Sequence, residues 1–170
     1  MPGASARKVV FDPRPILGIL ARHQVRFVVI GGIAATLQGS TTITNDFDIC
    51  YARDQGNLEG LAAALGELRA TLRGVREHVA FGLDARALKA GLNFTFDTKY
   101  GPFDCLGEAG GFYYEQLQRN ADGMDLVGTT VWVASLDDLI RMKRAAGRNK
   151  DLIEIENLSA LRQVRDRTSH

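Results

Sequence analysis

Two aspartates with one residue between them carry the clearest chemical signal in the sequence. Asp46 and Asp48 lie in the stretch 44–50, which has the apolar and polar alternation of a strand. Alternate side chains of a strand share a face, so both carboxylates would lie on one face with Cα atoms about 6.6 Å apart. Such a pair repels itself unless a hard cation neutralises it, and Mg²⁺, or Mn²⁺ in its place, suits oxygen ligands. The spacing predicts a metal site, while a solvent-exposed strand face would explain the same pattern.

A pair of glycines precedes these aspartates. Gly31 and Gly32 follow the apolar run 26–30, which is rich in β-branched residues and predicts a buried strand. The stretch 33–38 after them has the character of a short helix. At such a junction, bare backbone and helix N-terminal N–H groups can approach a phosphate. An ordinary tight turn would also account for two adjacent glycines.

A third carboxylate is expected on a hairpin that spans residues 92–106. Asp104 stands between Phe103 and Cys105, so alternation places its side chain on the polar face of the returning strand. Asp97, on the outgoing strand, is the competing candidate. A solvated hairpin position would explain either residue.

A basic segment, residues 141–150, contains five Lys and Arg residues and no acid. Most of it reads as a solvated helix face, but Lys143 follows the apolar stripe of its helix at i, i+3, i+4, i+7 spacing. A lysine on that stripe either reaches the edge of the protein or meets an anion. Asp151 lies on the same side of the next helix as Ile155 and Leu158. A Lys143–Asp151 salt bridge and a phosphate site are both open, and one site could hold both.

The elements that must position these residues alternate between helices and strands. We expect helices over 13–23, 33–38, 57–72 and 149–164, and another that begins at a capping box of Ser135 and Asp138. Expected strands cover 26–30, 47–51, the hairpin 92–106, and a pair at 124–127 and 130–133. A hairpin within this alternation predicts an α/β (α+β) fold, with a mixed, mostly antiparallel sheet flanked by helices.

Composition narrows the class of protein. The chain has 170 residues, 45% of them hydrophobic and 24% charged, which predicts one domain over residues 1–170 with a substantial core. A net charge of +1 excludes a nucleic-acid binder that acts by bulk positive charge. The longest apolar run, residues 27–35, is too short for a membrane span, and residues 1–10 lack the apolar core of a signal peptide. We therefore expect a cytoplasmic protein with no membrane partner, with disorder confined to residues 1–8 and 165–170.

Three segments resemble those of a known superfamily. The run 31–49, GGIAATLQGSTTITNDFDI, resembles the opening motif of nucleotidyltransferases of the DNA polymerase β type, in which a Gly-Gly or Gly-Ser turn precedes a D-x-D strand. The segment 135–158, SLDDLIRMKRAAGRNKDLIEIENL, is similar to the closing motif of a small prokaryotic branch that includes the AbiEii and MenT toxins. With the strand 103–106 between them, these segments come in the family's order and cover about a third of the chain.

The resemblance implies roles for the catalytic and metal-binding residues. Asp46, Asp48 and Asp104 would be the catalytic residues and the ligands of the metal ions. Asp104 matches the third aspartate, which helps to activate the attacking hydroxyl. Two metal ions held in this way can stabilise the attacking and leaving oxygens of an in-line displacement at the α-phosphorus of an NTP.

The resemblance also implies the nucleotide-binding residues. Gly31 and Gly32 would hold the triphosphate, Lys143 matches a phosphate-contacting lysine, and Asp151 matches an acidic residue of the closing motif. Thr42 stands where close relatives carry an arginine between the glycines and the D-x-D.

The implied activity is transfer of a nucleoside monophosphate from an NTP to an acceptor hydroxyl. By resemblance to the toxin branch, the acceptor would be the 3′ end of a tRNA, and a cognate antitoxin protein would be the partner. Transfer to a protein or small-molecule hydroxyl is a second possibility, and a nucleotide-binding module without activity is a third. Three retained aspartates speak against the third, because a site without a metal gains nothing from crowded carboxylates.

Overall fold

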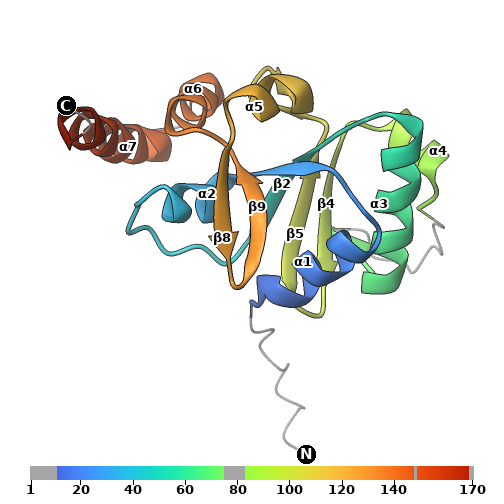
Figure 1. Ribbon diagram of the computed structural model, residues 1–170. Helices are drawn as coiled ribbons and strands as arrows, with labels where there is room; N and C mark the ends of the chain where they lie inside the picture. Colours follow the sequence, from blue (N-terminus) through green and yellow to red (C-terminus); the bar gives the residue numbers. More distant parts are fainter. Residues whose placement is uncertain (1–10, 75–82, 148, 169–170) are drawn as a thin grey trace, which may run out of the picture.

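A mixed sheet with helices on both faces forms the centre of the molecule (Figure 1). The computed structural model describes residues 11–74, 83–147 and 149–168. The strands are β1 (Phe27–Ile30), β2 (Phe47–Tyr51), β3 (Thr71–Leu72), β4 (Asn93–Thr98), β5 (Gly101–Leu106), β6 (Glu108–Ala109), β7 (Phe112–Tyr113), β8 (Asp122–Leu126) and β9 (Thr129–Val133). The helices are α1 (Pro13–Arg22), α2 (Gly31–Leu37), α3 (Gln55–Leu68), α4 (Ala85–Ala90), α5 (Tyr114–Asn120), α6 (Leu136–Ala146) and α7 (Asn149–Thr168).

The strand order of the main sheet places β2 near its middle. Over the described residues the order is β3-β4-β5-β2-β1-β9-β8, and β6 pairs with β7 in a separate hairpin. Within the main sheet β2 is parallel to β5 and β1 is parallel to β9, whereas the other neighbours are antiparallel. The prediction of a mixed, mostly antiparallel sheet flanked by helices is confirmed.

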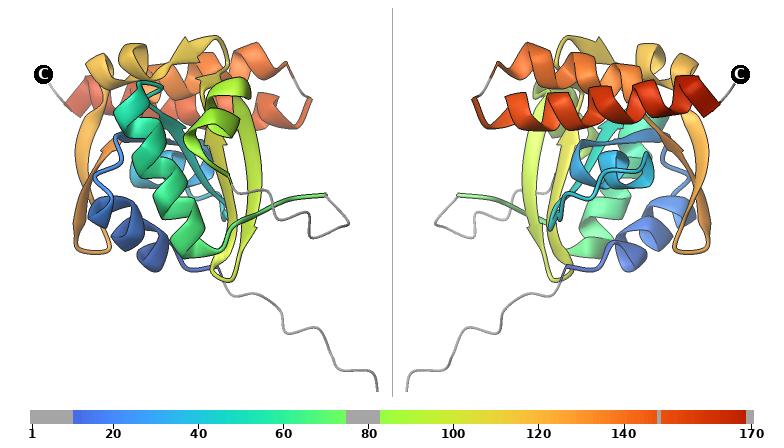
Figure 2. Two further views of the ribbon diagram at one scale, coloured as in Figure 1. Left: turned by 90° about the vertical axis from the view of Figure 1, so that its right-hand side faces the viewer. Right: turned by 90° about the vertical axis from the view of Figure 1, so that its left-hand side faces the viewer.

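Helices form a layer on each side of the sheet. The left view of Figure 2 shows α1 and α3 against one face, and the right view shows α2 on the other face, with α7 beyond it. Helices α6 and α7 lie against each other, and α6 also contacts α2. None of the helices in the described segments combines the length and apolarity needed to cross a membrane.

The face of the sheet toward α1 and α3 carries an aromatic cluster. Phe47 of β2 and Phe103 of β5 are fully buried, and their rings stack with centroids 5.7 Å apart. Phe27 of β1 meets Phe47 edge to face at 6.5 Å. Asp48 follows Phe47 on β2, and Asp104 follows Phe103 on β5. Because side chains alternate along a strand, these two aspartates lie on the opposite face of the sheet. The cluster thus joins three neighbouring strands directly behind the predicted carboxylate site.

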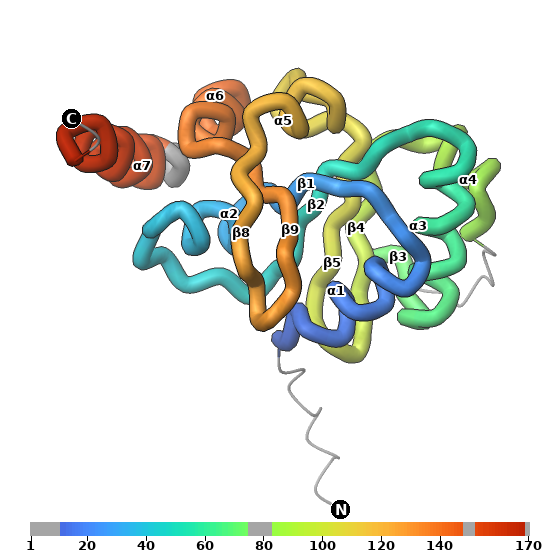
Figure 3. The backbone as a smooth tube through the Cα atoms, viewed as in Figure 1, coloured from blue at the N-terminus to red at the C-terminus, as the bar shows by residue number. Residues whose placement is uncertain are grey.

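Most expected elements are present within a few residues of their predicted bounds, including the Ser135 cap of α6, which accepts a hydrogen bond from the Asp138 N–H at 3.1 Å. The helix expected over 57–72 differs. It starts after the Asp54 cap and ends at Leu68, because Arg69 adopts the left-handed conformation with φ 51° and stops it. The next residues form β3, so the prediction of a helix to residue 72 was wrong (Figure 3).

Two further helices, α2 and α7, have bounds that differ from the predicted ones. Helix α2 begins at Gly31 rather than residue 33, so the glycine pair forms its first turn. Helix α7 continues to Thr168, which corrects the expected disorder of 165–168; there Arg165 donates to the Gln38 carbonyl at 2.9 Å. The other residues of the expected disordered ends, 1–8 and 169–170, lie outside the described residues. Helices α4 and α5 and the β6–β7 hairpin had no counterpart among the predicted elements.

The aromatic cluster gives a test of what holds the central strands together. Phe103→Ala removes a fully buried ring, and we expect it to lower the free energy of unfolding by about 3–5 kcal/mol in urea titrations. Ile43→Ala, at a side chain that is 89% exposed, is the control and should change it by no more than about 0.5 kcal/mol. Equal effects of the two substitutions would contradict this account of the core.

Candidate active site

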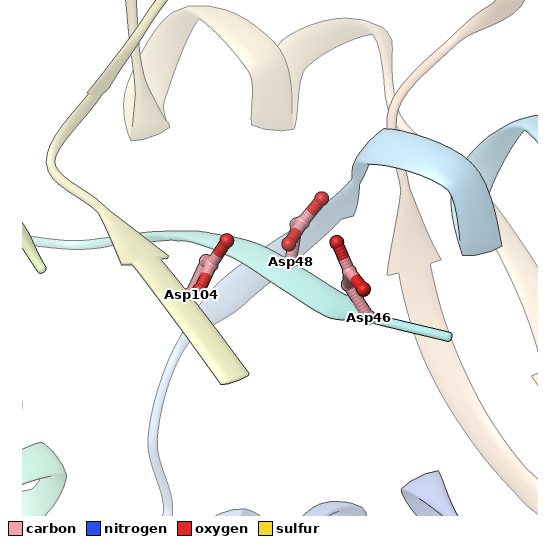
Figure 4. A group of neighbouring side chains, drawn as sticks. All are labelled: Asp46, Asp48 and Asp104. Atoms are coloured by element: carbon pink, nitrogen blue, oxygen red, sulfur yellow. The ribbon is translucent and has the colours of Figure 1, made fainter. Parts of the chain in front are cut away.

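Three aspartates meet on the face of the sheet opposite the aromatic cluster. Asp48 of β2 and Asp104 of β5 are register partners in a parallel pair, and Asp46 immediately precedes β2. One carboxylate oxygen from each of the three lies within 4.8 Å of the others. Figure 4 shows the three carboxylates side by side, Asp46 and Asp48 from one segment and Asp104 from the neighbouring strand. The structure therefore brings together the three residues predicted as metal ligands.

The carboxylate of Asp48 is buried beside two other acidic groups, an environment that favours a bound cation. Burial, followed by the nearby charges of Asp104 and Asp46, raises its pKa from 3.8 to about 7. Its Oδ1 atom is buried and has no hydrogen-bond partner among the described residues. A buried, unpartnered carboxylate oxygen is costly, and a divalent cation removes the cost by direct coordination. The donor set, oxygen atoms only, fits Mg²⁺ or Mn²⁺.

Asp104, rather than Asp97, joins this cluster. The side chain of Asp104 is 19% exposed and that of Asp97 is 55% exposed. Burial raises the pKa of Asp104, and the Arg73 guanidinium opposes this rise with a hydrogen bond of 3.0 Å to Oδ1. The same guanidinium binds Asp97 at 3.1 Å through Nε. The sequence left both hairpin aspartates open, and the structure places Asp104 in the cluster.

The glycine pair allows the start of α2 to approach the cluster closely. Gly31 has φ +70°, and a Cβ atom built there would lie 2.1 Å from Asp48 Oδ2. A Cβ at Gly32 would lie 2.6 Å from the Thr44 side chain. Side chains are thus excluded at both positions, and bare backbone faces the site, as the phosphate prediction requires.

A cleft of about 360 Å³ opens above the carboxylates. Its lining residues are Gly31, Gly32, Ala35, Ser40, Thr42, Ile43, Thr44, Asp46, Asp48, Asp104, Lys143, Glu154 and Leu158. One wall is the sheet and the start of α2, a second is the loop between α2 and β2, and the third comes from α6 and α7. The predicted site residues Gly31, Gly32, Asp46, Asp48, Asp104 and Lys143 line this cleft, and the side chain of Asp151 lies outside the described residues.

Lys143 reaches the cleft as its position on the apolar stripe of α6 predicts. Its side chain is 25% exposed, and its Nζ lies 2.7 Å from Glu154 Oε2 of α7. Glu154 was missed in the sequence, although its place four residues before the buried Leu158 was a signal that it shares that inward face. Asp151 belongs to α7, but its side chain lies outside the described residues, so its role and its salt bridge with Lys143 stay predictions.

Thr42 lies in the loop that forms the second wall. Its N–H donates to Ser40 Oγ at 3.2 Å, and its carbonyl accepts from Thr36 Oγ1 at 3.3 Å. The backbone at this position is thus tied to the end of α2. A short uncharged side chain stands on the cleft where the resemblance leads one to expect an arginine.

Solved structures share this fold. The lincosamide antibiotic adenylyltransferase LnuA, solved with lincomycin bound, has a TM-score of 0.60 at 11% identity over 91% of this chain and 99% of its own. A putative nucleotidyltransferase from Thermotoga maritima has a TM-score of 0.54 at 16% identity over 91% and 90%. The antibiotic-resistance factor ANT(2'')-Ia has a TM-score of 0.54 at 16% identity over 92% and 90%.

Sequence comparison adds no relative, since no family model and no curated protein matches the chain. At 11–16% identity the structural likeness establishes the fold alone. The fold expected from the resemblance, that of nucleotidyltransferases, is therefore confirmed. The assignment to the AbiEii and MenT type stays a prediction.

Gly31 offers a direct test of the close approach. We expect Gly31→Ala to displace the Asp48 carboxylate, because the new methyl group overlaps Oδ2 and φ +70° strains any side chain. Mn²⁺ binding, measured by calorimetry, should weaken at least about tenfold, in the range seen when metal ligands are misplaced.

Gly18→Ala is the matched control for this substitution. Gly18 is exposed in α1 with no neighbouring atom within 4 Å, and alanine there should stabilise the helix by about 0.5–1 kcal/mol without changing Mn²⁺ binding. Unchanged Mn²⁺ binding in Gly31→Ala would show that the turn does not govern the Asp48 position.

The raised pKa of Asp48 makes a second prediction, for protein in EDTA. A folded pKa of about 7 against 3.8 means that the folded state holds a proton which the unfolded state releases between about pH 4 and pH 7. The stability contribution of this carboxyl is fully present below pH 4 and is lost as pH rises through 7. Chemical denaturation should show wild type losing stability relative to Asp48→Asn over this window, on the order of a few kcal/mol.

Saturating Mg²⁺ should restore the stability of the wild type above pH 7 and leave Asp48→Asn nearly unaffected, because the metal binds the ionised carboxylate. Parallel pH profiles of the two proteins in EDTA would refute the raised pKa.

Proposed function

We propose that the protein is a metal-dependent nucleotidyltransferase, which moves a nucleoside monophosphate from an NTP to an acceptor hydroxyl. The observation that carries this proposal is the convergence of Asp46, Asp48 and Asp104 below a bare glycine backbone in one cleft. The shared fold supports it, since LnuA is a lincosamide antibiotic adenylyltransferase and ANT(2'')-Ia was solved in complex with adenylyl-2''-tobramycin.

Each group in the cleft has a place in this chemistry. Asp46 and Asp48 would hold a divalent cation, which stabilises charge on the phosphate oxygens during displacement. The Gly31 and Gly32 backbone leaves room for the triphosphate, and Lys143 adds positive charge at the opposite wall. Asp104 is placed beside the other two carboxylates, where it can accept the proton of the attacking hydroxyl.

Two acceptor classes are supported by different observations. The resemblance of residues 135–158 to the toxin branch favours the 3′ end of a tRNA, with an antitoxin protein as partner. The structural neighbours favour a small-molecule hydroxyl, because LnuA was solved with lincomycin and ANT(2'')-Ia with adenylyl-2''-tobramycin. Asp151 and Lys143 would contact the nucleotide in either case.

Labelled substrates test the activity and the acceptor together. Incubating the protein with Mg²⁺ and each α-³²P-labelled NTP should transfer label to total tRNA or to a hydroxylated small molecule such as lincomycin or tobramycin. Asp46→Ala and Asp48→Ala should each reduce transfer by about a thousandfold or more, since each removes a ligand of the cation. Asp125→Asn, an exposed aspartate of β8, is the control and should retain full transfer.

The location of the label separates the acceptor classes. Label on tRNA alone supports the toxin reading, and label on a small molecule alone contradicts it. NTP binding without transfer to RNA, protein or any small molecule, with Mg²⁺ or Mn²⁺, would contradict the enzyme proposal and favour a binding module.

A further inference from the structure

We propose that Arg73 is a positioning residue, which fixes the Asp104 carboxylate in the orientation that metal binding and hydroxyl activation require. This inference rests on the proposed function of the cleft and adds a residue to it. Arg73 follows β3 on the far side of the hairpin and has no counterpart in the motifs of the sequence.

The sheet register aligns Arg73 with the acidic cluster. The Arg73 N–H donates to the Thr95 carbonyl of β4 at 2.9 Å, Thr95 is the register partner of Asp104, and Asp104 that of Asp48. Register partners point to the same face. Arg73 therefore reaches across the short Thr95 side chain to the carboxylates.

The guanidinium of Arg73 makes directional contacts from one planar group. Nη2 donates to Asp104 Oδ1 at 3.0 Å and to the Phe96 carbonyl at 2.9 Å, and Nε donates to Asp97 Oδ1 at 3.1 Å. A planar fork held by Asp97 and a backbone carbonyl cannot rotate freely. The bond to Oδ1 consequently fixes the rotation of the Asp104 carboxylate, and with it the direction of Oδ2.

Such a clamp is needed because the metal-free cluster is repulsive. Asp48 of β2 and Asp46, which immediately precedes β2, repel Asp104, and a free Asp104 would lower this repulsion by turning away. Arg73 offers Asp104 a cation on the side of the hairpin while the backbone register keeps it beside Asp48. Hydrogen bonds that orient metal ligands from outside commonly change metal affinity by 10- to 100-fold.

Two other roles for Arg73 predict a different change in Mn²⁺ affinity when the residue is removed. If the guanidinium acts only as a positive charge near the site, removing it relieves repulsion of the cation, and Mn²⁺ should bind more tightly. If it only ties β3 to the sheet, removing it should lower the melting temperature in EDTA and leave Mn²⁺ affinity unchanged. Positioning alone predicts weaker metal binding.

The experiment is Mn²⁺ titration of the full chain by calorimetry, with melting temperatures in EDTA as the second readout. We expect Arg73→Met, which keeps side-chain length, to weaken Mn²⁺ binding by about 10- to 100-fold. Asp97→Asn leaves the Asp104 contact but loosens the fork, and a smaller, few-fold loss is expected. Arg73→Lys retains the charge with one point of contact and should fall between Arg73→Met and wild type.

Arg162→Met is the matched control, because Arg162 forms a comparable ion pair with Asp137 on α6, outside the cleft. It should leave Mn²⁺ binding unchanged. Equal or tighter Mn²⁺ binding by Arg73→Met would overturn the proposal, and full recovery by Arg73→Lys would contradict the role given to the planar guanidinium. If Arg73→Met does not fold, Asp97→Asn and Arg73→Lys decide the matter in the same titration.

The proposal and the function on which it rests can fail separately. Arg73-dependent Mn²⁺ binding without nucleotidyl transfer would refute the enzyme and keep Arg73 as a positioning residue of a metal site. A wild-type chain that binds no Mn²⁺ would refute both.

Discussion

Electrostatic repulsion among three aspartates is the constraint around which this molecule is organised. One carboxylate oxygen of each lies within 4.8 Å of the others, and Asp48 Oδ1 is buried with no hydrogen-bond partner in the described part of the chain. A free chain would separate these groups. They stay together because β2 and β5 are parallel neighbours in register, with Phe47 stacked on Phe103 directly behind Asp48 and Asp104. Apolar burial on one face of the sheet thus sustains an unfavourable charge arrangement on the other.

Among the described residues, the cationic side chains of Arg73 and Lys143 act on the cluster from different elements. Arg73 contacts Asp104 from the hairpin side, whereas Lys143 approaches from α6 and is paired with Glu154 of α7. Neither cation cancels the buried charge of Asp48, whose pKa remains raised to about 7. A divalent cation would bind most favourably beside Asp48, because Arg73 and Lys143 are each already paired with another carboxylate. A net charge of +1 for the chain therefore conceals separate acidic and basic groups.

Local periodicity predicted much of the fold, and its failures have physical reasons. Alternation around Asp46, Asp48 and Asp104 placed each carboxylate on the correct face, and the stripe of α6 placed Lys143. The end of α3 was missed because Arg69 adopts the left-handed conformation, which residues other than Gly, Asn and Asp rarely take, so the residue type does not mark the helix end.

Residues that act across the sheet were harder to predict. Arg73 and Glu154 become part of the site only through strand register and the contact of α6 with α7, and neither relation is encoded in nearby residues. The choice of Asp104 over Asp97 is of the same kind. Sequence spacing predicts on which face of a strand a side chain lies. Which side chains it contacts there depends on the register of the neighbouring strand.

The same distinction separates the chemistry of the cleft from its acceptor. The carboxylates and the glycine turn are fixed by hydrogen-bonded register and by excluded Cβ positions, so little in that wall can vary without breaking the sheet. The other walls are the loop with Ser40 and Thr42 and the paired helices with Lys143 and Glu154, none of which is a strand of the sheet. A fold can be shared at 11–16% identity while the residues that line a site differ, because specificity resides in the site rather than in the fold. Under the proposed function, acceptor specificity would be set at the loop and at α6 and α7, because the carboxylate wall would be occupied by the cation and Thr42 stands where the resemblance implies an arginine.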